Sequence, residues 1–119
     1  MFVLAKGQLD RGSYVTGRET FQDLIQRYPN YADLPAAVFY IGKAFDGEGN
    51  ATAADSVYQL VFTKYPKAPD APNALYKHAQ ILAARKKPAE AKAALQKLIA
   101  DYPKSDAAGL AASLLPTLK

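Results

Sequence analysis

Hydrophobic residues recur along this chain with the periodicity of α-helices that bury one face. Three segments carry large apolar residues at positions i, i+3, i+4 and i+7, which lie on one side of a helix. Each segment ends in a Tyr-Pro pair, and successive pairs are 37 residues apart (65 − 28 and 102 − 65). The same amphipathic helix is therefore predicted three times. The three sets are Phe21, Leu24, Ile25 and Tyr28; Tyr58, Val61, Phe62 and Tyr65; and Leu95, Leu98, Ile99 and Tyr102.

Glycine, proline and capping residues divide the chain into seven predicted helices. Gly12 and Gly49 suit the left-handed residue that ends a helix, and Ser13 and Asn50 follow them as N-caps of the next helix. The proline of each Tyr-Pro pair stops the helix that precedes it. The predicted helices cover about 2–11, 14–27, 35–47, 51–64, 72–85, 88–101 and 107–115.

The repeated helix pairs resemble those of the tetratricopeptide repeat family. In that family large residues fill the space between paired helices, and small residues let the helices approach. The middle repeat matches best, with Val38-x2-Ile41-Gly42-x2-Phe45, then Ala54-x3-Tyr58 and Pro66. The third reads Leu75-x2-His78-Ala79-x2-Leu82, Ala91-x3-Leu95 and Pro103, and the first, which is degenerate, reads Met1-x2-Leu4-Ala5-x2-Gln8, Gly17-x3-Phe21 and Pro29.

This resemblance implies an all-α fold, a right-handed superhelical solenoid of three helix-turn-helix repeats with a C-terminal capping helix. We expect a single domain over residues 1–119. The repeats would cover about 1–34, 35–71 and 72–106, and the capping helix about 107–115. The first helix of the first repeat lacks its opening turn, which predicts more protein upstream.

A narrower resemblance is carried by the longer period and by the stretch KYPKAPDAPNALYK at 64–77. These features resemble the C-terminal domain of the YbgF (CpoB) family, the periplasmic accessory proteins of the Tol-Pal system. The resemblance implies TolA as partner, a role in cell division, a periplasmic location and an upstream coiled coil that would form oligomers. His78 departs from the family, which places an aliphatic or similar residue there. Outer-membrane assembly proteins and other envelope proteins share Tyr-Pro repeats and are the alternative.

Tetratricopeptide domains line a concave groove with the first helix of each repeat, which implies partner-binding residues on the outward positions of those helices. An aromatic residue recurs there every 37 residues. Such a ladder would anchor an extended or helical peptide, with lysines that orient it. Alternatively, the aromatic residues complete the packing between repeats, and the sequence is compatible with both. The proposed positions are Phe2, Lys6, Phe39, Lys43, Asp46, Tyr76 and Gln80, with Leu9 and Ala83 beside them.

Charge is distributed unevenly, because residues 1–60 hold 5 basic and 7 acidic side chains and residues 61–119 hold 10 and 4. The densest basic run, Arg85-Lys86-Lys87, falls in a predicted turn and is either a patch for an anionic partner or a solvated turn. The other lysines are dispersed over both kinds of helix. Because nucleic-acid binding favours a continuous basic stripe, the sequence predicts a protein partner and no nucleic acid, with nucleic-acid binding as a remote alternative.

Residues that carry chemistry are scarce. The chain has no Cys and one His, so we expect no metal, no cofactor and no enzymatic activity. His78 is interpreted as a hydrogen-bonded histidine at the edge of the core. The pair Glu19 and Asp23 is interpreted as a solvated helix face, although the two carboxylates could share a cation. No run approaches about 18 consecutive apolar residues, so direct membrane insertion is not expected.

The repeat register also predicts which side chains matter for stability. Replacing Tyr58 by Ala would empty the core and cost about 3–5 kcal/mol. Replacing Glu48 by Ala, in a turn, would cost under about 0.5 kcal/mol. A side chain at Gly42 would push paired helices apart, so Gly42→Leu is expected to unfold the protein.

Overall fold

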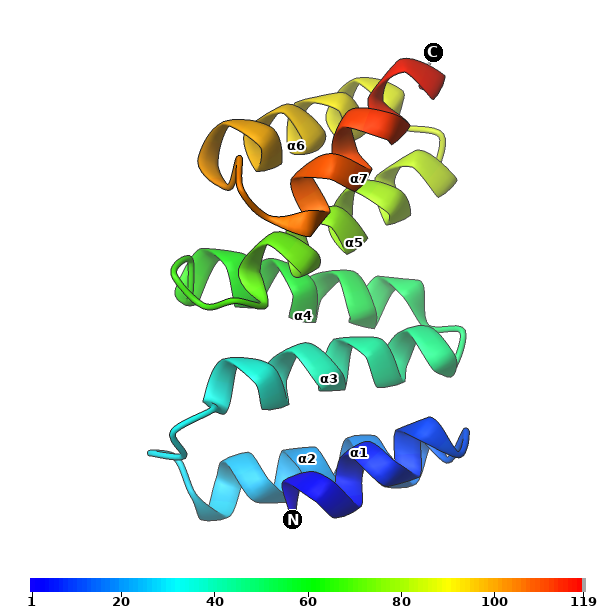
Figure 1. Ribbon diagram of the computed structural model, residues 1–119. Coiled ribbons are helices and arrows are strands. Elements are labelled where there is room, and N and C mark those ends of the chain that lie inside the picture. Colours follow the sequence, from blue (N-terminus) through cyan, green and yellow to red (C-terminus); the bar gives the residue numbers. More distant parts are fainter. Residues whose placement is uncertain (119) are drawn as a thin grey trace.

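Pairs of antiparallel helices follow one another along the axis of the molecule, as the sequence pattern predicts (Figure 1). The computed structural model describes residues 1–118, and within them every predicted helix is found with each end within one residue of its expected position. The all-α fold of three helix pairs and a C-terminal helix is confirmed. The helices are α1 (Phe2–Asp10), α2 (Tyr14–Arg27), α3 (Leu34–Gly47), α4 (Ala51–Lys64), α5 (Ala71–Ala84), α6 (Pro88–Asp101) and α7 (Asp106–Leu114), and a 3-10 turn, η1, covers Leu115–Thr117.

The turns inside the three pairs share one backbone geometry. Gly12 and Gly49 adopt φ values of +84° and +79°, which glycine tolerates because it has no Cβ. In the third turn Lys86 occupies the equivalent position with φ +61°, a conformation that costs free energy for a residue with a side chain. Asn50 caps α4 through its side chain, which accepts a hydrogen bond from the Ala53 amide. Ser13 precedes α2 without such a bond.

Each pair closes on a small residue that faces a large one. A Cβ atom at Gly42 would stand 2.7 Å from the ring of Tyr58, which is fully buried. In the other two pairs an alanine stands at the position of Gly42, and the large residue that faces it is smaller than tyrosine. The partners are Ala5 with Phe21 in the first pair and Ala79 with Leu95 in the third, all buried.

Successive pairs are joined by contacts of α2 with α3 and of α4 with α5. At the first junction Arg18 of α2 forms two hydrogen bonds with the carboxylate of Glu48, at 2.7 and 2.9 Å, and its guanidinium lies 4.7 Å from the centre of the Phe45 ring. At the second junction His78 is hydrogen-bonded to the buried carboxylate of Asp55. The interpretation of His78 as a hydrogen-bonded residue at the core edge is therefore confirmed.

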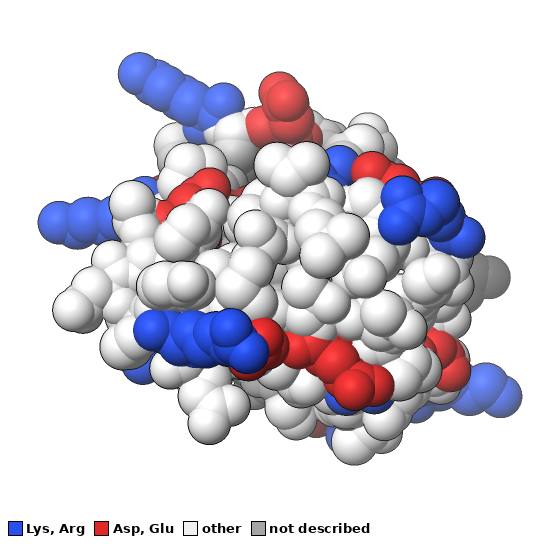
Figure 2. All heavy atoms as spheres, turned by 90° about the horizontal axis from the view of Figure 1, so that it is seen from below, with Lys and Arg blue, Asp and Glu red and all other residues white. Residues whose placement is uncertain are grey.

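The two ends of the stack differ. At the C-terminal end α7 covers α6 and α5 and buries Ala107, Ala108 and Ala111. At the N-terminal end Leu4 is 56% exposed, whereas Ile41, its equivalent in the second repeat, is 7% exposed beneath the preceding pair. Figure 2 looks onto this end of the molecule and shows that uncharged side chains cover most of its centre.

Candidate functional site

The first helices α1, α3 and α5 carry the residues that the sequence predicts to bind a partner, and the structure separates these residues into two groups. The aromatic residues turn inward or pack against the protein, whereas the polar residues reach solvent. Lys43, Asp46 and Gln80 are exposed, and Lys6 is half-buried. The predicted set is thus only partly accessible.

Phe39 does not face a ligand, so its expected exposure is wrong. Its side chain is 7% exposed, and its ring centre lies 5.7 Å from that of Tyr58 and 5.9 Å from that of Tyr40. Phe2 is half-buried, with its ring edge on Phe21 at 5.3 Å. For these two rings the alternative interpretation holds, because they complete the packing of the repeats. Tyr76 is half-buried against the third core.

Tyr40 was not among the predicted residues, yet two of the predicted lysines gather around it. The Lys6 ammonium nitrogen lies 5.6 Å and that of Lys43 5.4 Å from the centre of its ring. Lys6 also pairs with Asp10. Ammonium groups at such distances are attracted to an aromatic face. This chain therefore already places cations over an aromatic ring on the side that carries its first helices.

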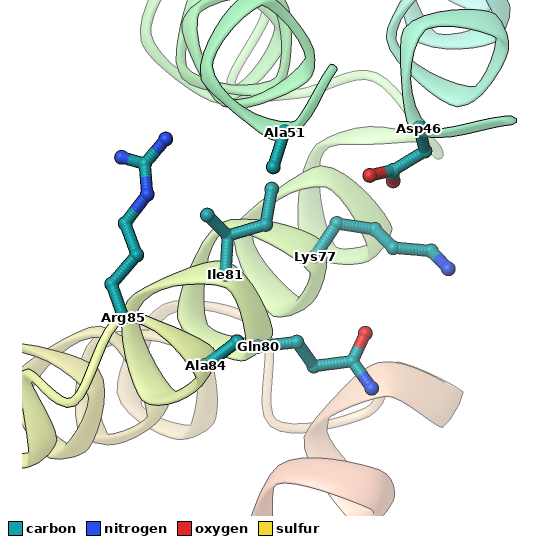
Figure 3. A pocket seen from close by; sticks show the side chains of 7 residues that line it. All are labelled: Asp46, Ala51, Lys77, Gln80, Ile81, Ala84 and Arg85. Atoms are coloured by element: carbon teal, nitrogen blue, oxygen red, sulfur yellow. The ribbon is translucent and has the colours of Figure 1, made fainter. Parts of the chain in front are cut away.

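A pocket of about 300 Å³ opens between the C-terminal end of α3 and α5 (Figure 3). Figure 3 shows Ile81 of α5 pointing toward Ala51 of α4, with Lys77 and Arg85 on opposite sides of them. Two residues predicted from the sequence, Asp46 and Gln80, lie in its wall. The full lining is Asp46, Ala51, Lys77, Gln80, Ile81, Ala84 and Arg85.

The charged side chains that line this pocket differ in the hydrogen-bond partners that they already have. The Tyr58 hydroxyl donates a 2.6 Å hydrogen bond to the carboxylate of Asp46, and burial raises the pKa of Tyr58, so the donor keeps its proton. Arg85 donates a hydrogen bond to the Thr52 hydroxyl and stays exposed. Two cationic side chains, Lys77 and Arg85, thus flank an apolar floor whose one carboxylate is already engaged.

The sequence interpretation missed five lining residues, which are Ala51, Lys77, Ile81, Ala84 and Arg85. Four of them lie on α5 or directly after it, at positions that the concave-groove pattern does not include, and Ala51 belongs to a second helix. The 37-residue period does contain a signal for this pocket, because comparing equivalent positions shows where one repeat has a small residue and another a large one. The comparison identifies a pocket only when the neighbours of those positions in the fold are known.

The described residues contain no candidate metal site and no candidate membrane-spanning helix. Among residues 1–118, no three His, Asp or Glu side chains gather in a way that could hold a metal ion. Within the same part of the chain, no helix combines the length and the apolar character that a membrane span needs.

Comparison with known proteins agrees with the helix pairs. The family model described as "Tetratricopeptide repeat" matches three segments, residues 1–31, 36–68 and 73–105. A solved structure, the type III secretion translocator chaperone SycD of Yersinia enterocolitica, superposes with a TM-score of 0.74 at 24% sequence identity, over 98% of this chain and 79% of that one. At this identity the likeness concerns the fold. No curated protein matches the chain.

Proposed function

Because this chain belongs to the tetratricopeptide repeat family, we propose that it is a protein-interaction scaffold that binds a segment of a partner on the face formed by α1, α3 and α5. The pocket between α3 and α5 carries the proposal. It lies on the side where Asp46 and Gln80 were expected to meet a ligand, and it combines an apolar floor with flanking polar groups. Protein sites that bind ligands have this composition.

The partner class we propose is a protein of the bacterial cell envelope. Its support is the sequence resemblance to the YbgF family, carried by the 37-residue period and the stretch at 64–77. On this proposal the domain acts in the periplasm within the Tol-Pal system, binds TolA during cell division, and forms oligomers through a coiled coil outside this sequence. An outer-membrane assembly complex is the alternative envelope partner.

A second candidate follows from the SycD likeness. That protein is a translocator chaperone of type III secretion, and its fold extends over nearly the whole of this chain. On this second candidate the same face would bind a secreted translocator, so the two candidates differ in the partner and share the proposed site.

Calorimetric titration with purified TolA tests the envelope proposal. Tyr76→Ala is expected to weaken binding by about 1–3 kcal/mol, as loss of an aromatic contact at an interface does. Lys43→Ala is expected to change mainly the association rate and its salt dependence. Gln96→Ala, on the exposed side of α6, is the matched control and should bind like the parent.

The results separate the site from the partner. Equal loss of affinity in Gln96→Ala and Tyr76→Ala would reject the face of α1, α3 and α5 as the site. Absence of any TolA binding would reject the Tol-Pal assignment. In the latter case the same variants, titrated with a translocator segment, test the chaperone candidate. All variants must remain folded at the temperature of the titration, which thermal unfolding checks, since unfolding would also reduce binding.

A further inference from the structure

The two junctions between helix pairs have the same backbone plan, but one is filled and the other is hollow. At the first junction the ring of Tyr14 lies against Gly47, so closely that a Cβ atom on the glycine would stand within 2.6 Å of three ring carbons. The residues 37 positions later are Ala51 and Ala84, and both line the pocket between α3 and α5. An aromatic ring thus occupies at the first junction the place that stays open at the second.

The contrast follows from side-chain size. Tyr14 is the first residue of α2 and Ala51 is the first residue of α4, so both start a second helix at the same position of the repeat. Glycine at position 47 leaves room for the tyrosine, whereas the alanine at position 51 has no ring to fill the equivalent place beside Ala84, and both alanines are exposed on the wall of the pocket. The resulting surface hollow of about 300 Å³ has the buried side chain of Ile81 as part of its apolar floor, which makes it a candidate for an incoming apolar group.

We propose that this pocket takes an aromatic side chain, Tyr or Phe, from the bound partner segment, which then occupies the place that Tyr14 fills at the first junction. The inference rests on the proposed function and specifies the chemistry of its ligand. The ring would lie on Ile81, Ala51 and Ala84, between the cations of Lys77 and Arg85.

The charges around the pocket indicate which residues of the partner segment should lie next to its aromatic residue. Lys77 and Arg85 border the pocket together with one carboxylate, that of Asp46, which accepts the hydrogen bond of Tyr58, so the cations of the lining outnumber its anion. A partner segment with Asp or Glu beside its aromatic residue therefore gains attraction to both cations. The preferred ligand is an acidic segment with one exposed Tyr or Phe.

The test uses N-acetyl-tyrosinamide as a probe and records amide chemical shifts of the isotope-labelled protein. We expect saturable shifts at Ala51, Ile81 and Ala84, with a dissociation constant on the order of 1 mM, the weak end of ligand affinities. N-acetyl-leucinamide should bind several-fold more weakly. Equal shifts with both probes would overturn the aromatic preference, and shifts confined to other residues would overturn the pocket.

A variant that rebuilds the first junction at the second provides the decisive comparison. The double substitution Ala51→Tyr with Ala84→Gly should fill the pocket from within and reduce probe binding at least tenfold while the protein stays folded. Ala89→Tyr, on the exposed start of α6, is the control and should bind the probe unchanged. Undiminished probe binding by the double variant would refute the proposal.

The double variant also distinguishes the aromatic pocket from the proposed scaffold function on which it rests. A partner that binds the parent and loses affinity in Tyr76→Ala, but not in the double variant, supports the scaffold and rejects the aromatic pocket. The acidic preference is measured with N-acetyl-Glu-Tyr-amide and N-acetyl-Lys-Tyr-amide. We expect the first peptide to bind more tightly and to lose more affinity with salt, and equal binding would reject the charge argument.

Discussion

Arg18 and Glu48 join the first helix pair to the turn of the second through two charge-assisted hydrogen bonds of 2.7 and 2.9 Å. Both side chains are about four-fifths buried, at 19% and 18% exposure. The expectation that Glu48→Ala costs under about 0.5 kcal/mol, as for an ordinary turn residue, therefore needs correction. A bidentate Arg–carboxylate pair in such a setting is among the stronger surface ion pairs.

For this pair we expect a coupling free energy of about 1 kcal/mol at pH 7 in a double-mutant cycle of Arg18→Ala and Glu48→Ala. The hydrogen bonds from Arg18 lower the pKa of Glu48 from its ordinary value of 4.5. A lowered folded pKa means that the stabilisation is present above pH 4.5 and is lost as pH falls through the folded value. Urea unfolding of the four proteins at pH 7 and near pH 3 measures it. Coupling that is equal at both pH values would contradict the assignment.

Size complementarity at Gly42 gives a second prediction. Gly42→Ala should destabilise the protein by about 1–3 kcal/mol, because the new methyl group meets the ring of Tyr58. Combining it with Tyr58→Leu recreates the Ala79 and Leu95 pair of the third repeat. The double variant should therefore lose less stability than the two single changes added together. Additive losses in chemical denaturation would show that the two residues do not share one contact.

The left-handed backbone conformation of Lys86 predicts a substitution that stabilises the protein. Lys86→Gly should stabilise the protein by about 0.5–1 kcal/mol, since glycine adopts φ +61° without a side-chain penalty but loses more backbone entropy on folding. Gly49→Ala is the reciprocal control, because a Cβ at that position meets no atom within 4 Å and only the backbone is strained. We expect it to cost about 1 kcal/mol. A lower denaturation midpoint for Lys86→Gly would contradict this account of the third turn.

Phe39 and Tyr76 occupy equivalent positions but should respond differently to truncation. Phe39→Ala removes a buried ring from between Tyr58 and Tyr40 and should cost about 3–5 kcal/mol. Tyr76 is half-buried, so Tyr76→Ala should cost clearly less. Thermal unfolding compares the two. Equal losses would mean that both rings belong to the core.

Helix ends were predictable because local chemistry sets them. Proline after each tyrosine and glycine at positions 12 and 49 stop helices by backbone geometry alone, whatever the tertiary contacts. The pairing of Gly42 with Tyr58 was predictable for a related reason, since the small and large positions recur with the repeat. In both cases the decisive information lies within about one repeat of sequence.

The accessible side of α3 was not predictable in the same way. Its residues Pro35 to Gly42 are apolar almost without interruption, so hydrophobic periodicity does not define an outward face. Phe39 is buried as a result, together with residues on the other sides of the helix. The pocket was not predictable for another reason. It lies where Ala51 and Ala84 are too small to fill the space beside Ile81, and a sequence shows residue sizes but not which small residues line the same hollow.

The order of contacts in the stack also governs how the protein reaches its structure. The most extensive contacts join helices that are neighbours in the chain, as with α2 and α3, and the smaller contact of α5 with α7 skips one helix. Each junction therefore closes a short loop and loses little chain entropy before its contacts form. Proteins with such local contacts fold in roughly microseconds to milliseconds, and linear repeats can nucleate at any unit and grow outward. The chain can therefore fold by adding one helix pair after another to the pair that forms first, and the formation of that first contact between neighbouring pairs sets the folding rate.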